Sequence, residues 1–111
     1  MLILERYMLA RLNQSTNIVE CGTSFGLSTI YLALAALQND PTQEAKGTVV
    51  TIEKDTTKLA RAREIWKIAG PDIEQWINPI DGDLLEVLAK STKLPETVDL
   101  LFLDGELLSF R

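Results

Sequence analysis

Two glycines and three small hydroxyl residues are gathered in the stretch VECGTSFGLS, between two apolar segments. Gly22 and Gly26 permit a backbone with positive φ and let a ligand approach without a Cβ in the way. Free N–H groups where a helix begins favour an anionic group such as a carboxylate, and Thr23, Ser24 and Ser28 add further donors. Two spaced glycines also fit a plain strand-to-helix turn, so a binding role needs support from elsewhere in the chain.

Two acidic residues are expected close to this loop. Glu20 stands near the end of the apolar segment before the loop, and Glu53 ends the β-branched segment TVVTIE. An acid at the end of the second strand of a nucleotide-binding sheet can accept hydrogen bonds from the vicinal hydroxyls of a ribose. Each acid alone also fits a solvated strand cap, but the two acids and the glycine loop together favour a binding site.

Apolar periodicity predicts alternating helices and strands that would position these residues. The alternation predicts a parallel α/β sheet with right-handed crossovers, in which ligands bind beyond the carboxyl ends of the strands. Pro79 places its strand at a sheet edge, and VDLLFLD is apolar enough to be covered on both faces. The expected helices are 2–12, Ser24 or Phe25 to Leu37, Thr56–Ala69 and Leu84–Lys90, and the expected strands are Ile18–Cys21, Thr48–Glu53, the segment WINPI and Val98–Asp104.

The composition fits one globular domain over residues 1–111, because 46% of the residues are hydrophobic and 24% are charged. The 11 basic and 16 acidic residues give a formal charge of -5 without a basic run, so we expect no nucleic-acid partner. No apolar run approaches the roughly 18 residues needed to cross a bilayer, and the segment MLILERYMLARL lacks the unbroken core of a signal peptide. We therefore expect no membrane partner.

The stretch VECGTSFGLS fits the E-x-G-x-x-x-G-x-S signature of class I S-adenosylmethionine-dependent methyltransferases. The sequence resembles most the small-molecule O-methyltransferases related to catechol O-methyltransferase, and the resemblance continues through GTVVTIEKD, GDLLEVL and VDLLFLDG. These motifs follow the family's order and cover nearly all of this chain, but only the first half of the family's catalytic domain. The resemblance implies a Rossmann-like parallel sheet with helices on both faces and the strand order 3-2-1-4.

The same resemblance implies an S-adenosylmethionine site and gives its residues their roles. Gly22 and the loop backbone would hold the methionine portion, Ser28 would lie near its carboxylate, and Glu53 would hold the ribose hydroxyls. Asp104 would lie near the methionine amino group, act in catalysis and bind a divalent cation such as Mg²⁺, which orients and acidifies the acceptor hydroxyl. The implied cofactor-binding set is Glu20, Gly22, Thr23, Ser24, Gly26, Ser28, Glu53, Lys54, Gly82, Asp83, Leu84 and Asp104, of which residues 82–84 would border the adenine.

The chain departs from the family pattern after the fourth strand. The family usually has a lysine three positions after the aspartate, and this chain has Leu107 there. The strand Val98 to Leu103, central in the family, would here be an open apolar edge, which invites pairing with another chain. We therefore expect that the 111 residues either belong to a longer protein or form a homo-oligomer through this strand.

The leading hypothesis is an S-adenosylmethionine-dependent methyltransferase that acts on a hydroxyl of a small-molecule acceptor. A nicotinamide-dinucleotide oxidoreductase also uses a glycine loop and a strand-end acid, but the usual G-x-G-x-x-G is absent because positions 24 and 27 are Ser and Leu. A non-catalytic or fragmentary methyltransferase-fold scaffold is the third hypothesis, and Leu107 favours it.

The remaining notable residues are expected to serve packing. Cys21, the only cysteine, cannot form an internal disulfide, which favours a cytoplasmic protein. It is expected to be a small core residue rather than a reactive thiol. Histidine is absent, which removes His-based triads and most zinc sites. Trp66 is expected in the core, and Trp76 either in the core or as a lid over the adenine, with the core favoured.

Overall fold

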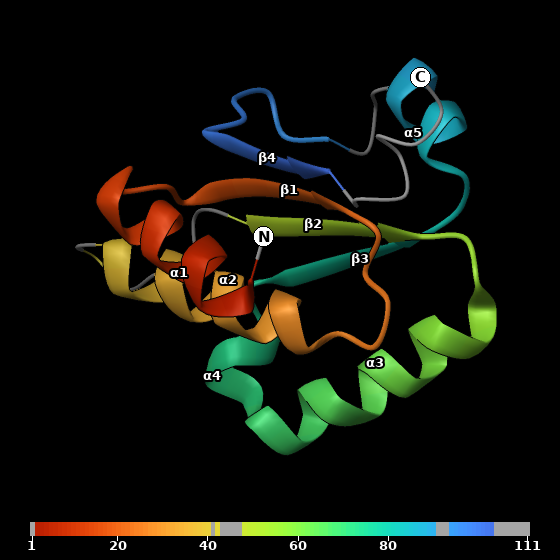
Figure 1. The fold of residues 1–111 in the computed structure, drawn as a ribbon, viewed down its shortest axis with the longest axis horizontal. Coiled ribbons are helices and arrows are strands. Elements are labelled where there is room, and N and C mark those ends of the chain that lie inside the picture. The colour runs from red at the N-terminus through yellow and green to blue at the C-terminus, as the bar shows by residue number, and fades with distance from the viewer. Residues whose placement is uncertain (1, 41, 43–47, 91–93, 104–111) are drawn as a thin grey trace.

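The computed structural model describes residues 2–40, 42, 48–90 and 94–103. These residues form a four-stranded parallel sheet with the order β3-β2-β1-β4, flanked by helices (Figure 1). The predicted strand order is therefore confirmed. In chain order the elements are α1 (Ile3–Leu12), β1 (Asn17–Cys21), α2 (Leu27–Asn39), β2 (Thr48–Glu53), α3 (Thr56–Ala69), α4 (Pro71–Glu74), β3 (Ile77–Asp81), α5 (Leu84–Lys90) and β4 (Leu100–Leu103).

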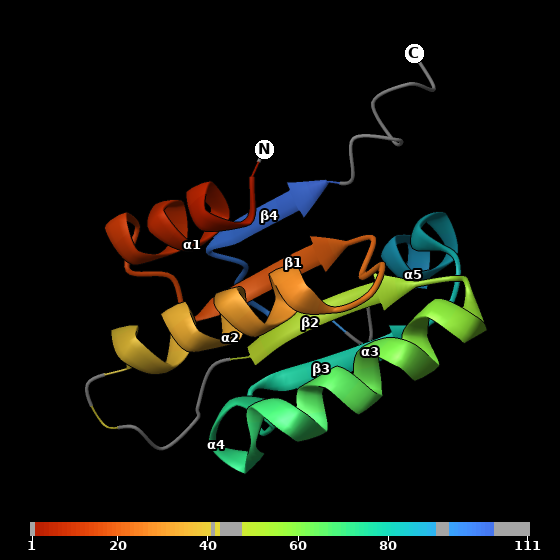
Figure 2. The same ribbon diagram turned by 60° about the horizontal axis from the view of Figure 1, so that its bottom comes forward.

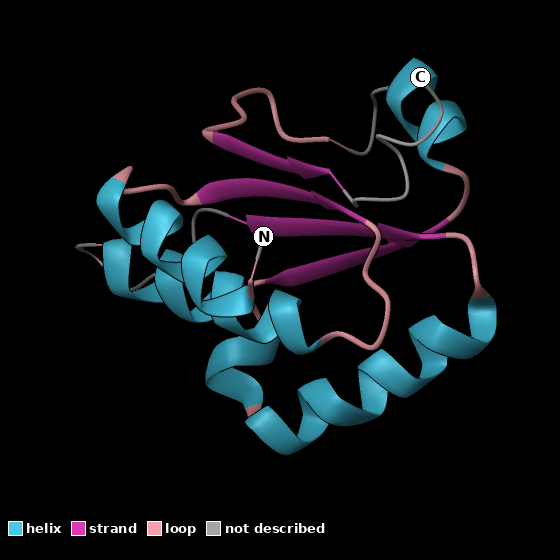
Figure 3. Ribbon diagram, in the orientation of Figure 1, coloured by secondary structure: helices cyan, strands magenta, loops and turns pink. Residues whose placement is uncertain are grey.

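Helices cover both faces of the sheet, as expected for this alternation of elements. The helices α1, α2, α3 and α4 lie on one face, and α5 lies on the other (Figure 2). Figure 3 shows the same layers by secondary structure, with the strands between the two sets of helices. Over the described ranges no helix combines the length and the apolar character that a bilayer span requires.

Alternation along the strands divides the core into two apolar layers. The layer under α1 and α2 contains strand residues Ile18, Val49 and Phe102. The layer on the α5 side contains Val19, Cys21, Val50, Ile52 and Ile80, with Leu84 and Val87 of α5 packed against it. Since successive strand residues point to opposite faces, the residues two positions after Ile18 and Val49, which are Glu20 and Thr51, face the α1 and α2 side.

The edge strand β4 is less covered than its apolar sequence suggested. Phe102 is buried, but Leu101 and Leu103 on the α5 side are 49% and 42% exposed. The prediction that both faces of this strand are covered is therefore wrong, because α5 packs over the layer from β1 to β3. Among the described strands β4 pairs with β1 alone, which confirms the predicted apolar edge.

Backbone conformation explains where the element boundaries differ from the prediction. The helix α2 begins at Leu27 rather than at Ser24 or Phe25, because Ser24 has φ 53° and Gly26 has φ 87°, and neither value is helical. The bounds of α3 agree with the prediction. Gly70, with φ 105°, ends α3, and Pro71 then starts the short helix α4, which was not predicted.

Candidate functional site

The loop between β1 and α2 is held open by left-handed residues and anchored to its neighbours. Gly22 has φ 100°, and its N–H donates to the carbonyl of Ile52 at 2.8 Å. At Gly26 an added Cβ would lie 2.7 Å from the Cβ of Ala62 and 2.7 Å from Nε1 of Trp66. The Trp66 indole donates to the Gly26 carbonyl at 3.0 Å. The missing Cβ of Gly26 therefore makes room for α3, whereas the sequence alone had suggested room for a ligand.

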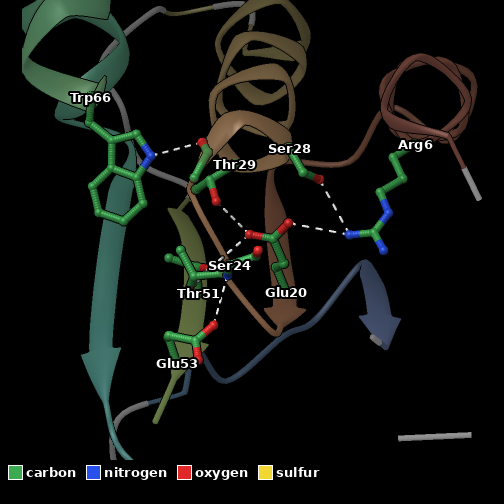
Figure 4. A network of polar contacts seen from close by, with 10 residues as sticks. Arg6, Glu20, Ser24, Ser28, Thr29, Thr51, Glu53 and Trp66 are labelled. Atoms are coloured by element: carbon green, nitrogen blue, oxygen red, sulfur yellow. Dashed lines mark hydrogen bonds and ion pairs between the residues drawn. The ribbon is translucent and has the colours of Figure 1, made fainter. Parts of the chain in front are cut away.

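The carboxylate of Glu53 faces this loop, as the hypothesis of a shared site requires (Figure 4). Its Oε1 accepts a hydrogen bond from the Ser24 N–H at 2.7 Å, and its Oε2 accepts one from the Asp55 N–H at 3.1 Å. The side chain is half-buried. Each carboxylate oxygen can accept more than one hydrogen bond, so both oxygens of Glu53 retain acceptor capacity for ligand hydroxyls.

The carboxylate of Glu20 points inward instead of toward the open end of the strand. It is fully buried, and its Oε1 accepts hydrogen bonds from Thr29 Oγ1 at 2.5 Å and Thr51 Oγ1 at 2.7 Å. Arg6 Nη1 lies 3.3 Å from its Oε2 in an ion pair. Burial raises the pKa of Glu20, and hydrogen bonds from Thr29, Thr51 and Ser28 and the charge of Arg6 oppose that rise. Glu20 thus holds neighbouring elements together.

A chain of hydroxyl groups links Glu20 to the loop. Thr23 Oγ1 and Thr51 Oγ1 lie 2.6 Å apart, and both side chains are buried. Because Thr51 donates its only hydroxyl hydrogen to Glu20, Thr23 must be the donor to Thr51. Thr23 therefore faces the interior and fixes the start of the loop rather than offering its hydroxyl outward.

Arg6 connects the amino-terminal helix to the same group of residues. Its Nη1 donates to Ser28 Oγ at 3.3 Å as well as to Glu20. Its guanidinium carbon lies 5.3 Å from the centroid of the Phe102 ring on β4. Sequence reasoning treated Arg6 as an ordinary helix charge and did not single out Thr29 or Thr51. Two signals in the sequence point to this group. Thr51 is a polar residue inside a β-branched strand, and Arg6 is a charge inside an apolar helix pattern.

The residues expected around the adenine lie beside Glu53. The N–H of Gly82 donates to the backbone carbonyl of Glu53 at 3.0 Å. Asp83 accepts from the Leu85 N–H at 2.8 Å and so caps α5. Leu84 is half-buried, and Lys54 is exposed next to Glu53. Asp104 and Leu107 lie outside the described residues, so their predicted roles stay predictions.

A family model described as a methyltransferase domain matches residues 19–109. This chain belongs to the methyltransferase domain family. That result favours the methyltransferase hypothesis over the oxidoreductase hypothesis, which shares the glycine loop and the strand-end acid. No curated protein matched the chain.

Solved structures similar to this methyltransferase domain agree with its fold. The O-methyltransferase TomG from Streptomyces achromogenes, involved in tomaymycin synthesis and solved in complex with SAM, has 28% identity and a TM-score of 0.75. An O-methyltransferase from Bacillus cereus in complex with SAH has 27% identity and a TM-score of 0.75. The matches cover 96% and 90% of this chain but only 47% and 42% of those chains. The chain therefore spans less than half the length of these relatives.

Three further residues of the methyltransferase domain have defined surroundings. Cys21 is buried, and burial together with the negative charge of Glu20 raises the pKa of its thiol to about 11. Trp66 and Trp76 are both buried, which confirms them as core residues. Within the described part of the chain, the Trp76 indole N–H is a buried donor without a partner.

Among the residues that the structure describes, no three His, Cys, Asp or Glu side chains gather into a group that could hold a metal ion.

Proposed function

We propose that the chain is the cofactor-binding part of an S-adenosylmethionine-dependent methyltransferase that transfers a methyl group to a hydroxyl of a small molecule. The observation that carries this proposal is the position of Glu53, whose carboxylate faces the glycine loop and accepts the Ser24 N–H at 2.7 Å. Membership of the methyltransferase domain family supports it. The two similar O-methyltransferases, which are bound to SAM and SAH, support the choice of cofactor.

Glu53 would bind the ribose of the cofactor. A ribose offers two adjacent hydroxyl donors, and a carboxylate accepts such donors through charge-assisted hydrogen bonds. The bonds from Ser24 and Asp55 fix the orientation of the carboxylate before any ligand arrives. A fixed acceptor loses little conformational entropy on binding, so preorganisation would add to affinity.

The amino-terminal end of α2 would bind the methionine portion. Gly26 precedes the helix without a side-chain cap, so the first N–H groups of α2 are open to an anionic ligand. Ser28 stands half-buried in this first turn. The carboxylate of an amino acid matches these donors, because Glu53 is bonded to the Ser24 and Asp55 N–H groups and Glu20 to side-chain hydroxyls, so neither acid bonds to the first N–H groups of α2.

Gly82, Asp83 and Leu84 would border the adenine, because the N–H of Gly82 already bonds to the backbone of Glu53. The cofactor would supply a methyl group activated on a sulfonium. The chain's own residues would hold the ribose and the amino-acid end and so orient the cofactor toward the acceptor, an entropic contribution. No described residue is given a role in binding the methyl acceptor.

A divalent cation at Asp104, the catalytic role of Asp104 and a cytoplasmic location are retained as proposals. The first two concern a residue outside the described part of the chain. The location rests on the single cysteine, Cys21, which is buried as a free thiol.

We also propose that a second copy of the chain pairs with the open edge of β4, because exposed Leu101 and Leu103 make that edge apolar.

Isothermal titration with S-adenosylhomocysteine tests the proposed function directly. We expect saturable binding by the folded chain, and no binding of NADH under the same conditions. Circular dichroism on the same sample shows whether the chain is folded. A folded chain that gives no heat at millimolar S-adenosylhomocysteine would contradict the proposal.

A further inference from the structure

We propose that Arg6 is a positioning residue for the amino-acid end of the cofactor. It acts through Glu20 and Ser28, and it keeps the first turn of α2 able to accept the methionine carboxylate. This inference rests on the proposed function, and it assigns a ligand-binding consequence to α1, a helix that the glycine-loop signature does not include.

The position of Arg6 allows one group to organise two side chains at once. Its Nη1 lies 3.3 Å from Glu20 Oε2 and 3.3 Å from Ser28 Oγ. An NH₂ group of a guanidinium carries two hydrogens, so both contacts can form together. The side chain of Arg6 is only 16% exposed, and the guanidinium also lies over the Phe102 ring. Arg6 is therefore held in place by packing as well as by charge.

The charge balance around Glu20 explains why Arg6 should matter for an anionic ligand. Glu20 is fully buried, and the other groups that contact its carboxylate are the neutral hydroxyls of Thr29, Thr51 and Ser28. Removing Arg6 would take away the positive charge at Ser28 in the first turn of α2, where the ligand carboxylate is proposed to bind, and the donor that holds Ser28 Oγ. A carboxylate-bearing ligand would lose this favourable charge interaction and the fixed position of Ser28, and so would lose affinity.

The same contacts predict that replacing Arg6 does not change the binding of the ribose at Glu53. Glu53 lies on β2 and bonds to Ser24 and Asp55, and no contact joins it to Arg6 among the described residues. A ligand that has the adenosine but lacks the amino-acid portion should therefore be insensitive to the loss of Arg6. This difference separates a positioning role from a general loosening of the site, which would weaken both ligands.

The experiment compares the binding of S-adenosylhomocysteine with that of 5′-methylthioadenosine, which lacks the amino-acid portion. Isothermal titration would use the wild-type chain, Arg6→Met, Arg6→Lys and the control Arg11→Met. Arg11 lies on the same helix and donates to Asn39 Oδ1 at 2.9 Å, in an exposed contact away from the loop. We expect Arg6→Met to weaken S-adenosylhomocysteine about tenfold, 5′-methylthioadenosine less than about twofold, and Arg11→Met to change neither.

Arg6→Lys keeps the charge but lacks the forked donors of arginine, so we expect an intermediate loss for S-adenosylhomocysteine alone. Equal weakening of both ligands in Arg6→Met, or no weakening of either, would overturn the inference. If Arg6→Met fails to fold by circular dichroism, the Arg6→Lys comparison decides, and equal weakening there has the same meaning.

A readout without ligand separates this inference from the proposed function. Hydrogen exchange of the Ile30 amide, which donates to the Gly26 carbonyl in the first turn of α2, should be faster in Arg6→Met than in the wild type, and unchanged in Arg11→Met. A wild-type chain that binds neither nucleoside would contradict the proposed function, while faster exchange in Arg6→Met would still support the hold of Arg6 on α2. Unchanged exchange would overturn the inference whatever the wild type binds.

Discussion

The carboxylate of Glu53 accepts a hydrogen bond from the backbone N–H of Ser24 at 2.7 Å, although the two residues are 29 positions apart. Ser24 adopts a left-handed conformation with φ 53°, which is uncommon for a residue with a side chain. The bond therefore stabilises an unfavourable turn and orients the strand-end acid at the same time. The loop and the acid form one structural unit.

Replacing Glu53 with alanine should weaken the binding of S-adenosylhomocysteine by about 1 to 3 kcal/mol, or roughly 5- to 150-fold. The loss includes the ribose acceptor and the support for the Ser24 turn. Isothermal titration measures it, with Glu64→Ala as the control, because Glu64 is exposed on α3. Unchanged affinity in Glu53→Ala would remove the main support for the proposed site.

Gly26→Ala should lower the free energy of unfolding by about 3 kcal/mol, because the new Cβ meets α3 and the residue has φ 87°. Gly70→Ala is the matched comparison, since Gly70 has φ 105° but no atom within 4 Å of an added Cβ. It should cost less, from backbone strain alone. Urea denaturation gives both values. An equal loss of unfolding free energy in the two variants would show that the close contact with α3 does not contribute to the loss in Gly26→Ala.

The stability of the chain should carry a pH dependence from Glu20. Burial raises the pKa of this residue in the folded chain above its ordinary value of 4.5, so the folded chain retains a proton that the unfolded chain has lost. The stabilisation from this residue is fully present below about pH 4.5 and declines as the pH rises through the folded pKa.

Glu20→Gln removes this titration and isolates it from the other carboxyl groups. The free energy of unfolding of the wild type minus that of Glu20→Gln should fall as the pH rises above about 4.5. Urea denaturation at a series of pH values measures this difference. A difference that stays constant or rises with pH would contradict the assigned direction.

The Cys21 thiol should react slowly in the folded chain. With a pKa of about 11, roughly one thiol in a thousand is ionised at pH 8, and the thiolate is the reactive form. Burial restricts access further. We expect reaction with a disulfide reagent to be at least about a hundredfold faster in urea than in buffer, as absorbance would show. Equal rates in the two solutions would indicate that Cys21 is accessible in the folded chain.

Association through β4 should respond to the polarity of its exposed side chains. Leu101→Lys should shift the sedimentation of the chain at tens of micromolar toward the monomer, because a charge at an edge strand disfavours pairing. Ile68→Lys is the control, since Ile68 is 85% exposed on α3, away from that edge. A wild type that sediments only as a monomer would exclude the proposed self-association.

The strands and helices followed from patterns that act locally, whereas the strand order 3-2-1-4 was implied by the family resemblance. The β-branched run TVVTIE and the proline of β3 each carry a strong backbone preference, and the bounds of β2 and α3 agree with those predicted. The start of α2 could not be predicted, because Ser24 takes a left-handed conformation that its side chain does not demand. That conformation is held by Glu53, which comes from another strand.

The partners of the buried Glu20 carboxylate could not be predicted from the sequence either. Glu20 stands at a strand end in a position that usually favours solvent, and only the folded chain brings Arg6, Thr29 and Thr51 to it. A pattern of apolar positions shows which residues are buried by preference. It does not show which charges find partners across 14 or 31 positions of sequence.

The bond from the Trp66 indole to the Gly26 carbonyl places a natural fluorophore against the glycine loop. Trp76 lies in the separate apolar cluster under α1 and α2. The tryptophan emission of a Trp76→Phe variant would therefore come from Trp66 alone, and its wavelength and intensity would report the state of the loop without an attached dye.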